Sequence, residues 1–245
     1  MKITAIVQAR MGSTRLSGKV MKELKGNTIL SHVIQRLKQA KLIDDIIIAT
    51  TEHSSDNVIE REAEQNGVRV TRGSEQDVLE RYYNAAKGNN TDVIVRITSD
   101  CPLIDPFIVD EMIKFYLEND YSLVTNAGAE YQQRTFPRGM DTEVFSFEVL
   151  EDAYVNGEKE YQREHVTPYI YEQEGNSIHY FKNDRDFSDY RLTLDTEEDF
   201  QLITEIYNKL YTGNHDFYLN DIVNLLKKEP KLYDINAHIE QKKVK

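Results

Sequence analysis

The residues best suited to chemistry lie in one stretch near the start of the chain, Gln8–Lys19, which reads QARMGSTRLSGK. It follows a short apolar run, Ile3–Val7, that predicts a strand. Its glycines let backbone N–H groups approach a ligand, its hydroxyls donate hydrogen bonds, and its Arg and Lys side chains neutralise negative charge. Such a loop after a strand is typical of polyphosphate binding, although a solvated basic turn has a similar composition.

Positive charge is concentrated around this stretch in a protein whose net charge is −12. The first acid in the chain is Glu23, and five cations precede it: Lys2, Arg10, Arg15, Lys19 and Lys22. The loop is not a Walker P-loop, because five residues separate Gly12 from Gly18 and Val20 stands where that motif has its magnesium-binding hydroxyl.

Two aspartates follow predicted strands further along the chain. Asp100 comes after the strand predicted at Asp92–Thr98, and Asp195 comes after one predicted at Tyr190–Leu194. Each has a simpler explanation, since Asp100 could stabilise a turn and Asp195 or Thr196 could cap a helix. Ligand sites in open α/β sheets lie at the carboxyl ends of strands. The pair, opposite the basic loop, therefore predicts a site for a magnesium–nucleoside triphosphate.

Three further clusters are candidates for ligand contact. RGSEQD at Arg72–Asp77 ends a predicted strand and enters a helix, so its backbone N–H groups could contact a base or phosphate, or Ser74 could simply cap the helix. PRGMDTE at Pro137–Glu143 and REHVT at Arg163–Thr167 combine Arg, His and carboxylates. Those residue types suit a polyhydroxylated acceptor, although Glu164 and His165 could also belong to a solvated helix face. The candidate acceptor residues are Arg138, Asp141, Glu143, Arg163, His165 and Thr167.

The composition sets the broad class of the protein. With 245 residues, 40% apolar content and 15 tyrosines, the chain predicts one globular domain spanning 1–245. The single cysteine, Cys101, allows no internal disulfide and makes a poor nucleophile with no histidine near it in sequence. We expect no signal peptide, no membrane span and a cytoplasmic location. The acidic balance argues against nucleic acid as a partner.

Hydrophobic periodicity predicts alternating strands and helices up to Asn126. The predicted strands are Ile3–Val7, Ile46–Thr50, Val68–Thr71, Asp92–Thr98 and Tyr121–Asn126. The predicted helices between them are Ile29–Leu37, Asp56–Asn66, Gln76–Lys87 and Pro106–Glu118. This alternation indicates an α/β fold with a Rossmann-like, doubly wound and mostly parallel sheet.

The alternation stops after Asn126. No period is visible at Gly128–Gly139, and the following pattern predicts the strands Val144–Phe147, Ser177–Lys182 and Tyr190–Leu194 and the helices Glu148–Val155 and Tyr161–Tyr171. We interpret 129–190 as an α+β insertion that forms a second wall over the carboxyl edge of the sheet, for acceptor binding and dimerisation. Two helices, Glu197–Leu210 and Leu219–Lys228, follow it, and we expect the last residues, 241–245, to be frayed.

With these residues in view, the chain resembles the sugar-acid cytidylyltransferases. QARMGSTRLSGK is similar to their first loop, AR-x-x-S-x-R-L-P-G-K, while RITSDCPLI and LDTEEDF resemble their two aspartate segments. TRGSEQDVLERYYNAA resembles the segment between. PRGMDTEVFSFEVL and REHVTPYIY resemble the branch of spore coat polysaccharide biosynthesis proteins, SpsF. The resemblance covers essentially the whole chain, and its motifs are specific in combination.

This resemblance implies an enzyme of the nucleotide-diphospho-sugar transferase type that makes a CMP-sugar and pyrophosphate from CTP, with Mg²⁺ and as a homodimer. It implies that Asp100 and Asp195 hold the metal, and that Arg10, Ser13, Arg15 and Lys19 hold the triphosphate. Catalysis falls to Arg10, Arg15, Lys19 and Asp100. The remaining candidates for nucleotide contact are Ala9, Gly12, Arg72, Gly73, Ser74 and Asp77.

Two departures from the family pattern limit what can be carried over. Ser17 replaces the usual loop proline, and Cys101 stands where octulosonate enzymes commonly have Glu. The sugar-facing region does not match those enzymes, so the resemblance does not name the acceptor, which we expect to be a keto-sugar acid. Two alternatives stay open: a glycosyltransferase that consumes a nucleotide sugar on the same fold, and a non-catalytic nucleotide-binding protein of a polysaccharide pathway.

Overall fold

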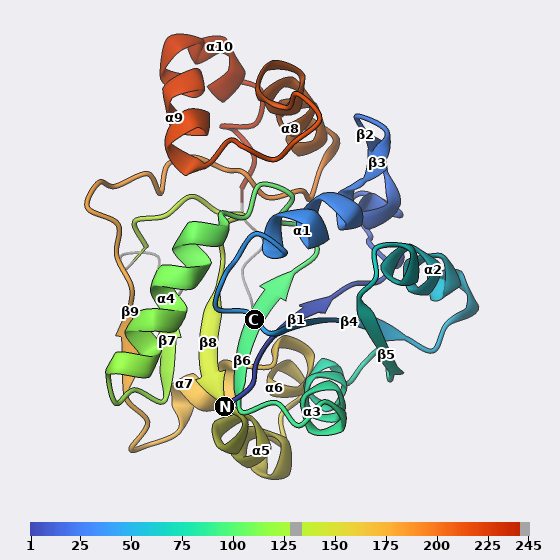
Figure 1. The fold of residues 1–245 in the computed structure, drawn as a ribbon, viewed down its shortest axis with the longest axis vertical. Coiled ribbons are helices and arrows are strands. Elements are labelled where there is room, and N and C mark those ends of the chain that lie inside the picture. The colour runs from blue at the N-terminus through green and yellow to red at the C-terminus, as the bar shows by residue number, and fades with distance from the viewer. Residues whose placement is uncertain (128–133, 241–245) are drawn as a thin grey trace.

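The fold is built on one seven-stranded sheet, seen in the computed structural model, which describes residues 1–127 and 134–240 (Figure 1). The strand order is β5-β4-β1-β6-β8-β7-β9. All neighbours pair in parallel except β8, which is antiparallel to both β6 and β7. The strands are β1 (Ile3–Gln8), β4 (Asp45–Thr51), β5 (Arg69–Gly73), β6 (Val93–Thr98), β7 (Leu123–Thr125), β8 (Glu143–Ser146) and β9 (Ile178–Tyr180).

Helices follow the strands of the first half, as the periodicity predicts. They are α1 (Ile29–Leu37), α2 (Asn57–Gln65), α3 (Val78–Gly88) and α4 (Pro106–Glu118). Local capping explains where two of them begin: the Thr28 hydroxyl accepts a hydrogen bond from the Ser31 N–H, and Asp105 caps α4 ahead of a proline in its first turn. A small hairpin of β2 (Glu23–Leu24) and β3 (Asn27–Thr28) precedes α1.

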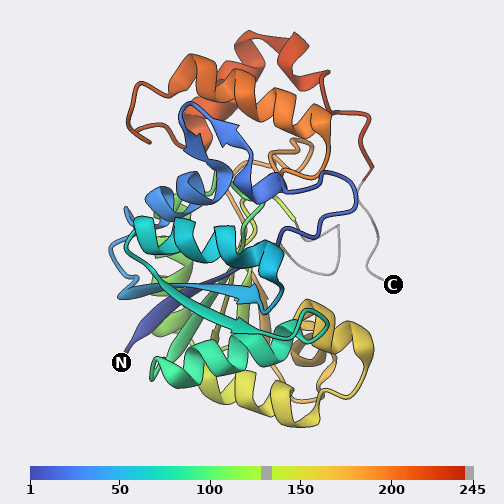
Figure 2. The same cartoon turned by 90° about the vertical axis from the view of Figure 1, so that its right-hand side faces the viewer.

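Two apolar cores lie on opposite faces of the sheet. Alternation along β1 divides its side chains, since Ala5 and Val7 join one core and Ile6 joins the other. The first core is shared with α1, α2, α4 and the C-terminal helices, and the second with α3 and the helices of the 129–190 segment. Figure 2 shows the result as helices stacked above and below the strands. The predicted α/β architecture is confirmed.

The 129–190 segment contains strands and helices, as expected of an α+β insertion, but two of its strands belong to the central sheet. These are β8 and β9. Its helices, α5 (Phe147–Asn156), α6 (Glu160–His165) and α7 (Pro168–Glu172), pack beside α3 on one face of the sheet instead of forming a wall over the carboxyl edge. The single helix predicted at Tyr161–Tyr171 is broken because Val166 has a positive φ of 72° and a proline begins α7. Residues 128–133 of the predicted aperiodic stretch lie outside the described residues.

The strand predicted at Tyr190–Leu194 is wrong. Its backbone makes only an isolated bridge between Arg138 and Arg191, and the Leu194 N–H donates to the Asp100 carbonyl across 2.9 Å. Leu192 and Leu194 are fully buried, and the polar Arg191 and Thr193 beside them are buried too. The alternating pattern therefore belongs to an extended buried loop and not to a strand with one face in solvent. This loop brings the chain to the carboxyl end of β6.

The C-terminal helices lie over that end of the molecule, at the top of Figures 1 and 2. They are α8 (Glu197–Leu210), α9 (Leu219–Lys228) and the short α10 (Pro230–Tyr233), and the first two match the predicted bounds. Thr196 caps α8 through a capping box with Asp199. No helix among the described residues is long and apolar enough to cross a membrane. The tail that we expected to be frayed, 241–245, lies outside the described residues.

Candidate active site

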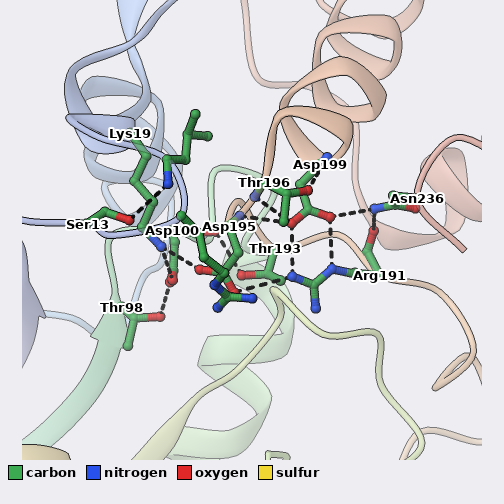
Figure 3. A network of polar contacts seen from close by, with 12 residues as sticks. Ser13, Lys19, Thr98, Asp100, Arg191, Thr193, Asp195, Thr196, Asp199 and Asn236 are labelled. Atoms are coloured by element: carbon green, nitrogen blue, oxygen red, sulfur yellow. Dashed lines mark hydrogen bonds and ion pairs between the residues drawn. The ribbon is translucent and has the colours of Figure 1, made fainter. Parts of the chain in front are cut away.

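The side chain of Lys19 lies between the two aspartates singled out in the sequence (Figure 3). Its Nζ atom is 2.8 Å from an Asp100 carboxylate oxygen and 2.7 Å from an Asp195 carboxylate oxygen. Lys19 begins a 3₁₀ turn after Gly18, whose positive φ of 63° lets the chain reverse there. Asp100 follows β6 and Asp195 precedes the cap of α8. The fold therefore joins three segments that are far apart in sequence.

Electrostatics keep this cluster charged. Burial by itself would lower the pKa of Lys19, but the neighbouring Asp100 and Asp195 carboxylates outweigh it and raise that pKa above its usual value. Burial would likewise raise the pKa of Asp100, yet the Lys19 ammonium and the Thr98 hydroxyl bring it below its usual value. At neutral pH Lys19 is therefore a cation and Asp100 an anion.

A buried network fixes the position of Asp195. Its Oδ2 atom is 2.9 Å from an Arg15 nitrogen and 3.3 Å from an Arg191 nitrogen. Arg191 also donates to Asp199, which is fully buried and accepts the backbone N–H of Asp195 at 2.9 Å. Asn236 donates to Asp199 across 2.8 Å. Sequence reasoning missed Arg191 and Asn236, although an arginine inside the alternating YRLTL pattern is a signal for a buried ion pair.

The helix cap beside Asp195 is assigned by the structure. The Thr196 hydroxyl accepts the Asp199 N–H at 3.2 Å, so Thr196 and not Asp195 caps α8. This division leaves the Asp195 carboxylate to face Lys19 and Arg15.

The Asp100–Asp195 pair fits a divalent cation by the chemistry of its donors. Both carboxylates already converge on one cationic atom, and hard cations prefer carboxylate oxygens. Within 1–127 and 134–240, no group of three or more His, Cys, Asp or Glu side chains forms a metal site. Two carboxylates with substrate phosphates completing the shell are the arrangement in which proteins commonly hold Mg²⁺.

Arg10 lies on the other side of the first loop from this cluster. Its guanidinium is 2.7 Å from Glu75 Oε1, and His53 Nε2 is 2.9 Å from the second oxygen of Glu75. A Cβ added at Gly12 would come within 3.3 Å of Glu75, so the glycine lets the loop pass close to this carboxylate. The structure thus divides the predicted triphosphate residues, with Arg15 and Lys19 at the aspartates and Arg10 at the loop after β5.

The predicted contacts at Arg72–Asp77 have local structural partners. The Arg72 guanidinium donates to the Thr51 and His53 carbonyls and to the side chains of Asn57 and Glu60. The cap of α3 is Asp77, whose carboxylate accepts the Glu80 N–H at 2.8 Å, while the Ser74 hydroxyl accepts the Asp77 N–H at 3.2 Å. Gly73 and Ser74 line a cavity of about 570 Å³ together with His53, Arg72 and Glu75.

Glu143 and Thr167, two of the six acceptor candidates, meet in a buried cluster. Glu143 accepts hydrogen bonds from Arg96 at 2.5 Å, Tyr171 at 2.7 Å and Thr167 at 3.2 Å. Burial and the neighbouring Glu143 raise the pKa of Tyr171 well above its usual value, so its hydroxyl stays a donor. Arg96 was missed in the sequence, where an arginine in the apolar strand DVIVRIT is its signal.

The other four acceptor candidates lie apart from that cluster. Arg163 donates through Nε to Asp77 at 2.9 Å, which joins α6 to α3. Asp141 pairs with buried Arg134, and the Arg138 backbone carbonyl accepts the Leu192 N–H. His165, at the end of α6, is partly exposed. Burial and the nearby Asp100 raise the pKa of Cys101 well above its usual range, which keeps the thiol protonated, as expected of the poor candidate nucleophile that the sequence indicates.

Fold and site together define an α/β nucleotide-binding protein with a charged cluster at the carboxyl end of its parallel strands. A family model described as cytidylyltransferase matches residues 4–236, so the chain belongs to the cytidylyltransferase family, and it is a nucleotidyltransferase. The resemblance seen in the sequence is thereby confirmed.

Similar proteins match different shares of the chain. It is 40% identical to an uncharacterized protein of Methanocaldococcus jannaschii, over 99% of this chain and 97% of that one. It is 33% identical to spore coat polysaccharide biosynthesis protein SpsF of Bacillus subtilis, over 93% of this chain and 95% of that one. Similarity to the 3-deoxy-manno-octulosonate cytidylyltransferase of Geotalea daltonii, at 36%, covers 51% of this chain and 48% of that one.

Solved structures share the fold. A cytidylyltransferase from Leptospira borgpetersenii superposes with a TM-score of 0.90 at 40% identity, over 98% of this chain and 100% of that one. CMP:2-keto-3-deoxy-manno-octonic acid synthetase complexed with CTP superposes with a TM-score of 0.67 at 17% identity, over 85% of this chain and 99% of that one. At that identity the likeness extends to the fold alone.

Proposed function

We propose that this protein transfers CMP from CTP to a sugar hydroxyl and releases pyrophosphate. The observation that carries the proposal is the ammonium of Lys19 held between Asp100 and Asp195, with Arg15 on the same carboxylate. The names of the SpsF and octulosonate relatives support a sugar product in polysaccharide biosynthesis. The CTP complex on the same fold supports the choice of nucleotide.

In the proposed reaction, the acceptor oxygen forms a bond to the α-phosphorus of CTP. The bond from that phosphorus to the bridging oxygen of the β-phosphate breaks, and pyrophosphate leaves with the electron pair. The acceptor hydroxyl gives its proton to water as it attacks. Arg15 and Lys19 neutralise charge on the triphosphate, and the Gly12 N–H and the Ser13 hydroxyl supply further donors.

Asp100 and Asp195 would hold Mg²⁺ between them. When bound, the metal would supply Lewis-acid stabilisation of charge on the phosphates. Because the pKa of Asp100 is lowered, its carboxylate is suited to binding a cation and is a weak proton acceptor. Lys19 then exchanges one anionic partner for another, since the phosphates can replace the carboxylates around its ammonium.

For the acceptor, we propose a keto-sugar acid bound by the 129–190 segment of a single 1–245 domain. Asp141 supports this assignment, because it lies close enough to Cys101, next to Asp100, to raise the pKa of that thiol. Arg138 supports it through its bridge to Arg191, a partner of Asp195. We further propose a cytoplasmic homodimer, in which the same segment takes part in dimerisation.

The test is to measure pyrophosphate release from each of the four nucleoside triphosphates, with Mg²⁺, against a panel of sugars and keto-sugar acids. Release with CTP and one acceptor is the expected result. Consumption of a nucleotide sugar without pyrophosphate would favour the glycosyltransferase. CTP binding without turnover on any acceptor would favour the non-catalytic protein.

A further inference from the structure

Arg81 is a buried cation whose hydrogen-bonding capacity is almost unused. It lies in the first turn of α3, and its side chain is 2% exposed. Its Nε atom is buried and has no hydrogen-bond partner, and its Nη1 atom makes one long contact of 3.5 Å with the Ala49 carbonyl. No ion pair joins it to a carboxylate of the described residues. Buried polar groups without partners are rare in native proteins and call for an explanation.

The surroundings of Arg81 show that the fold makes room for it. A Cβ added at Gly73 would come within 3.0 Å of Arg81 Cγ, so the glycine that ends β5 allows the side chain to pass beneath it. The Ala49 carbonyl that Arg81 contacts also accepts the Ala9 N–H at 3.2 Å. The guanidinium therefore lies below the point where β1 leads into the first loop. Burial lowers the pKa of Arg81, and the opposing influence of Tyr82, Asp56 and Glu75 does not outweigh it.

The position along the sheet favours a contact with the base and not with the phosphates. The carbonyl that the Arg81 guanidinium contacts lies on β4, whereas Asp100 follows β6, two strand spacings away in the order β5-β4-β1-β6. At about 4.8 Å per spacing, that is about 10 Å, a distance that an extended nucleotide covers from its phosphates to its base. The phosphate-binding cations, Arg15 and Lys19, gather at the other end.

The second arginine at this end is not available for the same role. Arg72 was the cation predicted to contact the nucleotide from the loop after β5, yet its guanidinium donates four hydrogen bonds to the 51–60 segment. Arg10 is paired with Glu75. Among the three arginines near the base end, Arg81 is the one whose donors are not occupied by the chain.

We propose that Arg81 reads the base of the nucleotide, donating to the O2 and N3 atoms of cytosine. This rests on the proposed function and names the residue that selects CTP. Cytosine presents acceptors at both atoms, which matches the two parallel donors of a guanidinium. Uracil carries a hydrogen on N3, so its N3–H would face a guanidinium N–H and no hydrogen bond could form there. A site built around buried polar groups discriminates strongly against a ligand that leaves them unpaired.

The experiment is calorimetric binding of CTP, UTP and inorganic tripolyphosphate, each with Mg²⁺, to the wild-type protein and to Arg81→Met. We expect the variant to bind CTP about 10- to 100-fold more weakly, since a hydrogen bond to a charged group is worth about 1.5–3 kcal/mol. Tripolyphosphate should bind within about twofold of wild type, and the preference for CTP over UTP should fall toward one. Arg61→Met is the matched control, because Arg61 is an exposed arginine that contacts only the Asn57 carbonyl.

Two further variants separate base reading from stability. Arg81→Lys keeps the charge but lacks the two parallel N–H donors of a guanidinium. It should therefore bind CTP more tightly than Arg81→Met does, yet lose the preference for CTP over UTP. Gly73→Ala, which pushes on Arg81 Cγ, should shift the preference in the same direction and by less. Thermal unfolding checks that each variant is folded. If Arg81→Met does not fold, Gly73→Ala and Arg81→Lys provide the test.

Other outcomes overturn the proposal. Equal weakening of tripolyphosphate and CTP would place Arg81 at the phosphates, and equal weakening of CTP and UTP would show a structural role. Wild-type protein that binds tripolyphosphate without preferring CTP would contradict the proposed function itself, and the reading of the base with it.

Discussion

Two buried carboxylates of this molecule are paired with cations in opposite ways. Asp195 shares Lys19 with Asp100 and also pairs with Arg15 and Arg191, so several charges of both signs meet at the carboxyl end of the sheet. Glu143, on β8, is enclosed by donors from Arg96, Tyr171 and Thr167. The first arrangement can exchange partners, because Arg15, whose side chain is 36% exposed, and Lys19 can turn to phosphates and leave the carboxylates to a metal cation. The second is enclosed and holds a single cation. An ion pair alone therefore does not mark a binding site, whereas a partly exposed cluster with several cations does.

The largest expected effect comes from the cluster around Lys19. Asp100→Asn keeps the shape of the side chain and removes the charge that faces Lys19, so we expect pyrophosphate release to fall by at least about 100-fold. Circular dichroism and thermal unfolding should show a folded protein. Turnover near the wild-type rate would contradict the assignment of Asp100 to the metal and the phosphates.

The next effect separates two lysines of the same loop region. Lys19→Met should reduce turnover by about 100-fold, because Lys19 is the cation held at both aspartates. Lys22→Met is its control and should stay within about threefold of wild type, because Lys22 pairs with Glu197, whose side chain is 68% exposed. Steady-state rates of pyrophosphate release decide the matter, and equal losses in both variants would remove the special role of Lys19.

Glu143→Gln should affect stability more than chemistry. The change leaves Arg96 buried without its counter-charge, which costs about 3 kcal/mol in the free energy of unfolding. Urea denaturation measures that loss, and CTP binding by the folded variant should change by less than about threefold. A variant of unchanged stability that no longer uses its acceptor would show that Glu143 is an acceptor ligand, as its sequence position first indicated.

The smallest expected effect concerns another buried polar group, the hydrogen-bonded pair of His32 and His215. Their ring nitrogens Nδ1 and Nε2 are 2.8 Å apart, and His32 Nε2 is 2.7 Å from the Leu24 carbonyl. Burial and the nearby charge of Arg36 lower the pKa of His215 to about 3. An unfolded histidine takes up its proton near pH 6.5, so this pair stabilises the fold above that pH and its contribution falls as pH decreases toward about 3.

That pH dependence can be measured with a single variant. Urea denaturation at pH 7 and at pH 5 should show a larger loss of stability in wild type than in His215→Gln, since the variant lacks the group that protonates on unfolding. Nucleotide binding to the folded proteins should be the same at a given pH. An identical loss in both proteins would mean that the pair does not titrate between the two states.

Much of the fold followed from local patterns. The helix at Ile29–Leu37 begins at Thr28 because that hydroxyl accepts the Ser31 N–H, and α4 begins at its proline, as the sequence indicated. The alternation at Tyr190–Leu194 misled because this extended loop is buried on both sides, with polar side chains such as Arg191 paired inside the protein. Periodicity says nothing of which backbone partner a segment meets.

The candidate site divides in the same way. The residue types of Gln8–Lys19 and the two aspartates pointed to phosphate chemistry before any coordinates, because cations, glycines and carboxylates after strands suit it. Arg72 was chosen on the same grounds, yet its donors are used by the neighbouring loop. Arg81, a buried arginine with unused donors, matched the family segment but was not among the candidate site residues. Whether a charged side chain is occupied depends on its neighbours in space.

Residue types and local patterns alone indicated an α/β protein with a basic, glycine-containing loop after its first strand, an aspartate at a later strand end and a second one before a helix. Those features are local, since each depends on residue types within one turn, one strand or one helix start. The tertiary structure was needed to show that Lys19 meets both Asp100 and Asp195, that Arg191 and Asn236 hold that corner in place, and that Glu143 is enclosed by donors. Contacts between residues far apart in the chain are fixed by strand order and core packing, which no single stretch of sequence encodes.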